Sequence, residues 1–198
     1  RMLGAATDEI ALSAGGTEAL YALIANYAPL RAEDAGIYAD VDYDEMQFAC
    51  DYLAQSRGAQ LVRFDLPEPQ TKANILAAYD KILRDTPRAK LLLLTHLSNR
   101  NGLVPPVKAI VAMAKARGVD VILDSAQAVG HIPFTVADTG ADFIGLVFVP
   151  GRRRRLELDV ARKLVEGLKN GPGGIPRVVG LFADQPLEEV NHIIETCN

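Results

Sequence analysis

Short apolar runs alternate with amphipathic segments along this chain of 198 residues. The apolar runs predict about seven strands, at residues 9–13, 36–39, 60–64, 90–95, 119–124, 142–149 and 177–183. The amphipathic segments predict helices between them, at residues 17–28, 44–57, 72–84, 104–116, 159–169 and 186–195. Runs such as LLLLT and DVILD are apolar on both faces, which is typical of a parallel sheet covered by helices on each side. The pattern predicts a doubly wound α/β fold in a single three-layer α/β/α domain, with a mostly parallel sheet.

Composition and charge narrow the function classes. Hydrophobic residues make up 49% and charged residues 23% of the chain, the ordinary balance of a globular domain. The net charge of −4 argues against nucleic-acid binding, which depends on neutralising phosphates. No apolar run reaches about 18 residues, so we expect no membrane span. The chain starts without a signal-peptide stretch, and Cys50 and Cys197 match no metal-binding spacing, so we expect a cytoplasmic protein with free thiols.

A glycine pair lies between the first predicted strand and the first predicted helix. Gly15 and Gly16 precede Thr17, which is followed by Glu18. Glycines let a backbone approach a phosphate, and the free N–H groups of a helix start favour an anion. A tight turn with Thr17 as the helix cap explains the same residues equally well.

Polar residues follow three of the predicted strands, where the carboxyl edge of a parallel sheet gathers functional groups. Asp124 ends the strand at 119–124, and a carboxylate there can pair with a protonated pyridine nitrogen, with Gln127 within reach of the same ring. Asp124 as a cap of the following turn is the structural alternative. Asn99 follows the strand at 90–95, where Thr95 or His96 could also line a pocket. Tyr43 follows the strand at 36–39, where its ring could cover a planar cofactor or pack on the sheet edge.

In order, the segments GGTEAL, DVDYDEM, THLSNRNGLVPPV, VILDSAQAVGHIPFTV and TGADFIG resemble the class V aminotransferase-like enzymes, which use pyridoxal phosphate (PLP). The resemblance covers residues 5–145 and implies the fold type I architecture. It also implies that Gly16 and Thr17 hold the phosphate, Asn99 and Gln127 the phenolic oxygen, and Asp124 the ring nitrogen, with Tyr43 near the stacking position. Such enzymes build their sites at a dimer interface, so the resemblance leaves a homodimer open.

The sequence departs from this family at the residue that carries the covalent chemistry. The family's Schiff-base lysine follows the strand that TGADFIG opens, but here the chain continues LVFVPGRRRRLELD, and the next lysine is Lys163. The family's smaller domain also has no counterpart in the sequence. Since the lysine anchors the cofactor and moves protons, we expect no catalytic residue, no required cofactor and at most non-covalent PLP.

The last part of the chain has a resemblance of its own. The segments LVFVPGRRRR and VVGLFADQP look like phosphoribosylanthranilate isomerase, a TIM-barrel enzyme, over residues 140–198. In that family the basic turn contributes an arginine to substrate binding, which makes Arg153 and Arg154 candidates for an anion site. A solvated basic loop is the alternative reading of the same arginines.

Two hypotheses follow. The first is a recombined or designed chimera, with residues 1–145 of PLP-enzyme type and 146–198 of barrel type in one domain. It has no complete active site and retains weak affinity for PLP or phosphate. The second is a PLP-dependent transferase or lyase rescued by a repositioned lysine or a partner chain. The chimera predicts that the strand near residues 178–182 runs parallel to the sixth strand, because a helical segment separates them.

Overall fold

The computed structural model describes residues 10–11, 13, 15–147 and 178–179. Several predicted features lie outside these residues: the helices at 159–169 and 186–195, and the candidate anion-binding residues Arg153 and Arg154. The described strands are β1 (Ile10–Ala11), β2 (Ala35–Ala39), β3 (Gln60–Phe64), β4 (Ala89–Thr95), β5 (Asp120–Asp124), β6 (Phe143–Gly145) and β7 (Val178–Val179). The described helices are α1 (Gly16–Ala25), α2 (Asp44–Arg57), α3 (Lys72–Asp85), α4 (Val107–Lys115) and α5 (Val136–Thr139).

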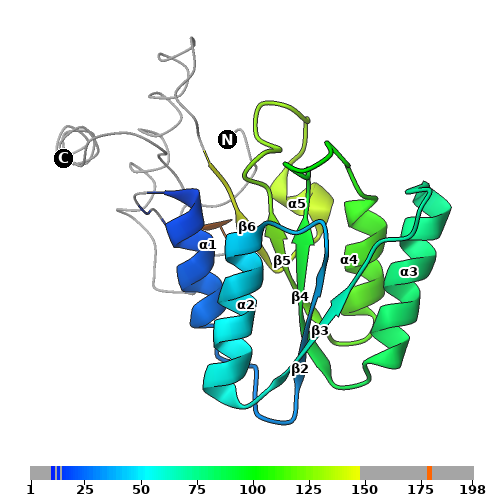
Figure 1. Ribbon diagram of the computed structural model, residues 1–198. Coiled ribbons are helices and arrows are strands. Elements are labelled where there is room, and N and C mark those ends of the chain that lie inside the picture. The colour runs from blue at the N-terminus through cyan, green and yellow to red at the C-terminus, as the bar shows by residue number, and fades with distance from the viewer. Residues whose placement is uncertain (1–9, 12, 14, 148–177, 180–198) are drawn as a thin grey trace, which may run out of the picture.

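The strands form one parallel sheet in the order β1-β7-β6-β5-β4-β2-β3 (Figure 1). Every described strand pair is parallel, so all carboxyl ends lie at one edge. The chain moves outward from β2 to β3 and returns to β4 on the other side of β2, which makes the β2–β4 boundary the switch point of the sheet. The predicted parallel pairing of the seventh strand with the sixth is confirmed, with Ile144 beside Val178.

Helices cover both faces of the sheet, which confirms the three-layer prediction (Figure 1). Leu92 and Leu94 of β4 pack in one apolar cluster with α3 and α4, whereas Leu91 and Leu93 pack in a second cluster with α1 and α2. Successive side chains of a strand point to opposite faces, so a run of leucines supplies both clusters. The apolar run that predicted a two-sided strand therefore builds the two cores between the layers.

The helices differ from the predicted ones in several places: α1 ends at Ala25, three residues earlier than predicted, and α4 and α5 differ for reasons of local sequence. The fourth helix begins at Val107, three residues later than predicted, because Pro105 and Pro106 lack the N–H groups of a helix interior and bias the residue before each away from helix. The short α5 was not predicted. Its start is set by a capping box in which the Thr135 side chain accepts from the Asp138 N–H while Asp138 accepts from the Thr135 backbone. No helix in the described part of the chain is long and apolar enough to cross a membrane.

Candidate cofactor site

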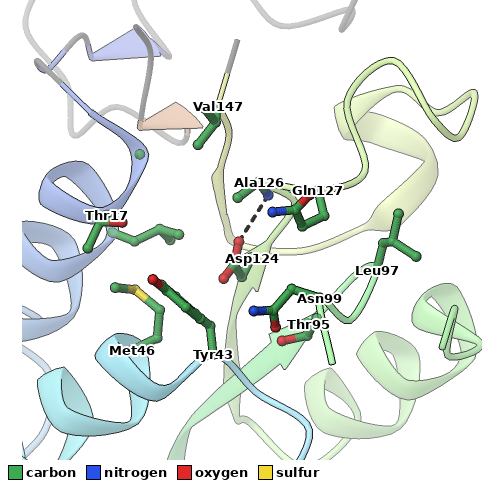
Figure 2. A pocket seen from close by; sticks show the side chains of 12 residues that line it. Thr17, Tyr43, Met46, Thr95, Leu97, Asn99, Asp124, Ala126, Gln127 and Val147 are labelled. Carbon is green, nitrogen blue, oxygen red and sulfur yellow. Dashed lines mark hydrogen bonds between the residues drawn. The ribbon is translucent and has the colours of Figure 1, made fainter. Parts of the chain in front are cut away.

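One pocket of about 200 Å³ opens at the carboxyl edge of the sheet (Figure 2). The elements around it are the start of α1, the start of α2 and the segments that follow β4, β5 and β6. All six predicted cofactor-binding residues line it: Gly16, Thr17, Tyr43, Asn99, Asp124 and Gln127. The structure thus brings together residues that lie as much as 111 positions apart in the chain (127 − 16). Their individual roles toward a ligand stay predictions.

Asp124 is the charged group at the centre of this pocket (Figure 2). Its side chain ends β5 and is only 6% exposed. One carboxylate oxygen, Oδ1, accepts from the Ala126 N–H at 2.9 Å, so Asp124 does cap the following turn. Burial raises the pKa of Asp124 to about 6, with the Ala126 hydrogen bond opposing the rise. Since no ion pair among the described residues includes Asp124, a cation entering the pocket would find an unpaired carboxylate.

Neutral polar groups surround this carboxylate. Asn99 and Gln127 come from the segments after β4 and β5, and Figure 2 shows both amide groups on the same side of the pocket. The hydroxyl oxygen of Thr95 is buried and has no hydrogen-bond partner among the described residues. A buried polar atom without a partner costs free energy, which a ligand group that bonds to it would recover.

The start of α1 forms the opposite wall. Gly15, and not Thr17, is the N-cap residue, and it makes no side-chain capping bond, so the alternative of Thr17 as helix cap is wrong. The first N–H groups of α1 therefore keep their capacity to bind an anion. A Cβ at Gly16 would lie 2.0 Å from Val147 Cγ2, so this glycine is required for the approach of the chain after β6. Val147 therefore occupies part of the space beside Gly16 in which the sequence predicts a phosphate.

Apolar residues that no motif indicated complete the pocket. They are Leu20, Met46, Leu97, Ala126 and Val147. Met46 is fully buried one turn into α2, while Tyr43 is the partly buried N-cap residue of that helix. Their apolar character matches many core positions of the chain, so no local signal separates them from ordinary core residues.

His96 contacts neighbouring side chains of the fold and does not line the pocket, unlike Thr95 beside it. Its Nδ1 lies 2.9 Å from Ser125 Oγ, and its ring packs edge-on against Phe134 with centroids 4.6 Å apart. Burial lowers the pKa of His96, which favours the neutral ring. Of the two candidates after β4, Thr95 lines the pocket and His96 does not.

The pocket combines a free helix start, a buried carboxylate and inward amide groups. An anionic group fits the α1 start, and a cationic ring nitrogen fits Asp124, with hydrogen-bonding groups between them. The residues present therefore fit a flat, phosphorylated pyridine such as PLP. None of the lysines in the described part of the chain lines the pocket.

Comparisons with known proteins agree with this geometry. The class V aminotransferase family model matches residues 1–147. A cysteine desulfurase of Yersinia pseudotuberculosis is 37% identical over 142 residues, which cover 70% of this chain and 34% of that protein. A cysteine desulfurase of Yersinia pestis is 36% identical over 141 residues, with the same coverage. The chain thus spans about a third of the length of these curated relatives.

Solved structures show the same fold. A cysteine desulfurase of Escherichia coli aligns with a TM-score of 0.63 at 19% identity, over 93% of this chain and 49% of the other. The apo cysteine desulfurase of Thermococcus onnurineus aligns with a TM-score of 0.63 at 22% identity, over 74% of this chain and 36% of the other. The family match and the sequence identity of the relatives together show that this chain belongs to the class V aminotransferase family of PLP-dependent enzymes.

Proposed function

We propose that the pocket at the carboxyl edge binds PLP and that the chain supplies the cofactor-binding part of a class V aminotransferase-like transferase or lyase. The observation that carries the proposal is the convergence of all six motif residues on one pocket around an unpaired, buried carboxylate. The start of α1, with Thr17, would hold the phosphate. Asn99 and Gln127 would bind the phenolic oxygen, and Tyr43 would cover the ring.

The residues of the pocket would prepare the ring for chemistry. When bound, PLP supplies an electron sink for charge that develops at a substrate carbon. Asp124 would hold a proton at the ring nitrogen, because a carboxylate with no competing cation stabilises the protonated form. Thr95 and the amides would orient the ring by hydrogen bonds, while Leu20 and Met46 would exclude water from one side. The buried position of Asp124 strengthens its electrostatic interaction with a ring cation.

The recombined chimera with no complete active site is the second candidate. It agrees with one observation, the parallel pairing of β7 with β6, which that hypothesis predicts. On this proposal PLP binding is non-covalent, and residues 146–198 derive from an isomerase-like barrel. From the sequence we also propose that Arg153 and Arg154 form an anion site and that two chains associate.

Titration with PLP tests the first proposal. We expect saturable binding, measured by calorimetry; a chain without the covalent anchor should bind with a dissociation constant no tighter than micromolar. Asp124→Asn keeps an acceptor for the Ala126 N–H but removes the charge, and we expect about tenfold weaker binding. Asp142→Asn is the matched control, because its carboxylate also accepts a backbone N–H but lies at the other edge of the sheet. Equal affinities of wild type and Asp124→Asn would contradict the assignment.

Reduction with borohydride separates the two candidates. Covalent attachment of PLP to one lysine in stoichiometric amount, located by mass spectrometry, is expected of an enzyme with a repositioned lysine. Binding without such attachment is expected of a chain with no complete active site.

A further inference from the structure

Asp42 directly precedes Tyr43 and does not line the pocket, yet its side chain links the end of β2 to the end of β4, where Thr95 does line the pocket. The side chain is fully buried, with 0% exposure. Its Oδ2 accepts from the Ala39 N–H at 2.7 Å, and its Oδ1 accepts from the Thr95 N–H at 2.9 Å. Ala39 ends β2 and Thr95 ends β4, so one carboxylate bridges the two strands at the switch point of the sheet.

The backbone around Asp42 accepts hydrogen bonds from two further segments, α2 and the chain after β4, which both contribute residues to the pocket. Its carbonyl accepts from Gln47 Nε2 of α2 at 2.6 Å, and the neighbouring Val41 carbonyl accepts from Ser98 Oγ at 3.3 Å. Ser98 adjoins Asn99, and Gln47 adjoins Met46, both of which line the pocket. Residues on either side of the pocket thus depend on the position of this one segment.

We propose that Asp42 is a positioning residue, whose carboxylate form holds the ends of β2 and β4 in the arrangement that binds the phosphorylated pyridine ligand. The proposal rests on the proposed PLP function. A carboxylate offers a charged acceptor to both N–H groups, whereas protonation turns one of its oxygens into a hydroxyl, a weaker acceptor whose own proton needs a partner. Protonation therefore weakens the hold on Ala39 or Thr95, and Thr95 itself lines the pocket.

The surroundings of Asp42 place its ionisation in an accessible pH range. Burial raises the pKa of Asp42 to about 7. The Ala39 N–H, the nearby Thr95 hydroxyl and the Thr95 N–H oppose the rise, while the charge of Asp124 reinforces it. The other titratable groups that face it are Cys50 from α2 and Tyr79 from α3, whose own pKa values burial and this carboxylate raise. No ion pair among the described residues includes Asp42.

PLP affinity measured from pH 5.5 to 8.5 tests this role, with Asp42→Asn and Asp40→Asn compared. An asparagine at position 42 has one acceptor for two N–H groups, so we expect about fivefold to tenfold weaker binding at pH 8. Asp40 is the matched control, because its carboxylate accepts a single N–H, that of Leu66 at 2.9 Å, which an asparagine can keep. Asp40→Asn should bind as wild type does.

The pH profile adds a readout that a merely structural role would not move. In wild type and in Asp40→Asn the affinity should fall as the pH drops through about 7, beyond the change due to the ligand's own titration. Asp42→Asn should lack that component, because its side chain does not titrate. Identical affinities and profiles for wild type and Asp42→Asn would overturn the proposal.

A second measurement needs neither the variant nor the ligand. In wild-type protein without PLP, the amide ¹⁵N and ¹H shifts of Ala39 and Thr95 should titrate together with one midpoint near 7. A shared midpoint below about 5, close to an ordinary aspartate, would overturn the proposal. If the amides titrate as expected but wild type binds no PLP at any pH, then the proposed function fails while the bridge by Asp42 stands.

Discussion

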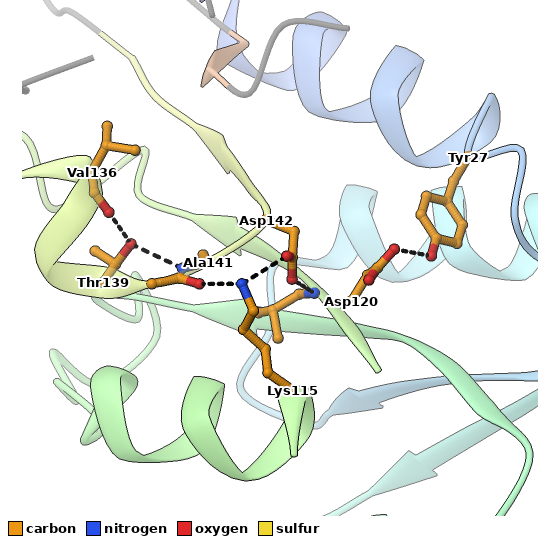
Figure 3. Close-up of polar contacts among 9 residues, drawn as sticks. Tyr27, Lys115, Asp120, Val136, Thr139, Ala141 and Asp142 are labelled. Atoms are coloured by element: carbon orange, nitrogen blue, oxygen red, sulfur yellow. Dashed lines mark hydrogen bonds and ion pairs between the residues drawn. The ribbon is translucent and has the colours of Figure 1, made fainter. Parts of the chain in front are cut away.

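The two edges of the sheet use aspartates in opposite ways. At the amino edge, Lys115 Nζ donates to Asp142 Oδ1 at 2.9 Å, and Asp142 Oδ2 accepts from the Val121 N–H at 2.9 Å (Figure 3). Asp120 accepts from the Tyr27 hydroxyl at 2.7 Å (Figure 3). Each of these carboxylates has a donor from another segment, and the contacts join α4 and the turn after α1 to β5 and to the residue that precedes β6. These contacts stabilise the packing of the helical layers on the sheet.

The carboxyl edge leaves two buried aspartates without a cation among the described residues. Burial raises the pKa of Asp42 to about 7 and that of Asp124 to about 6. An uncompensated buried charge costs free energy, so the fold tolerates it only where a further interaction is gained. This difference agrees with the proposal that the carboxyl edge binds a ligand, while the contacts at the amino edge hold the layers together.

The largest loss of stability is expected from a substitution where α1 packs against β6. A Cβ at Gly145 would lie 2.1 Å from Leu20 Cδ2 and 2.2 Å from its Cγ, and Leu20 is buried. We expect Gly145→Ala to lower the free energy of unfolding by about 3 kcal/mol, because the added methyl group would push Leu20 of α1 away from β6. Urea denaturation measures this. Gly15→Ala is the control, because nothing lies within 4 Å of its added Cβ, and an equal loss there would refute the packing argument.

The second effect is the pH dependence of stability. The pKa of Asp42 is higher in the folded state, at about 7, than its ordinary value of 3.8, so the folded state binds the proton more tightly. The stability that the folded state gains from this tighter proton binding is fully present below pH 3.8 and is lost as the pH rises through about 7. We expect wild type to lose about 2 kcal/mol relative to Asp42→Asn between pH 5 and 8, measured by chemical denaturation. A constant difference would show that Asp42 titrates as it does in the unfolded chain.

The third effect tests the amino edge. Asp142→Ala leaves Lys115 with one partner fewer and the Val121 N–H without its acceptor. We expect a loss of about 1.5 kcal/mol in the free energy of unfolding, with PLP affinity unchanged. The exposed pair of Lys81 with Asp85 provides the control, for which Asp85→Ala should leave the free energy of unfolding nearly unchanged. Weaker PLP binding in Asp142→Ala would show that the two edges are coupled.

The smallest effect concerns one hydrogen bond at the same edge. Tyr27→Phe removes the hydroxyl that donates to Asp120 Oδ2 at 2.7 Å and also lies 3.2 Å from the Lys90 carbonyl oxygen. The substitution keeps the ring, which packs edge-on against Phe143. We expect a loss of about 1 kcal/mol by thermal or chemical denaturation, again without a change in PLP affinity. No measurable loss would mean that water replaces the hydroxyl at Asp120.

Most of the architecture followed from the pattern of the sequence. The apolar runs predicted the strands, because a strand buried on both faces needs apolar residues at consecutive positions, as Leu91 and Leu92 show. The six motif residues that line the pocket could also be singled out in the sequence, since they follow strands or start helices, where the chain turns at the carboxyl edge; their roles stay predictions. The start of α4 was missed by three residues and α5 was missed altogether, because short-range capping and prolines outweigh the apolar period there.

The sequence by itself determined the fold class, the family and the set of residues that could meet a cofactor, because these depend on local periodicity and on motifs. The tertiary structure decided which of them share a pocket, that Thr95 faces it and that His96 packs against Phe134 instead. It also revealed the bridge of Asp42 between Ala39 and Thr95, which no motif indicated. Burial, unpaired charge and contacts between distant segments arise only when the chain is packed, so no local pattern carries them.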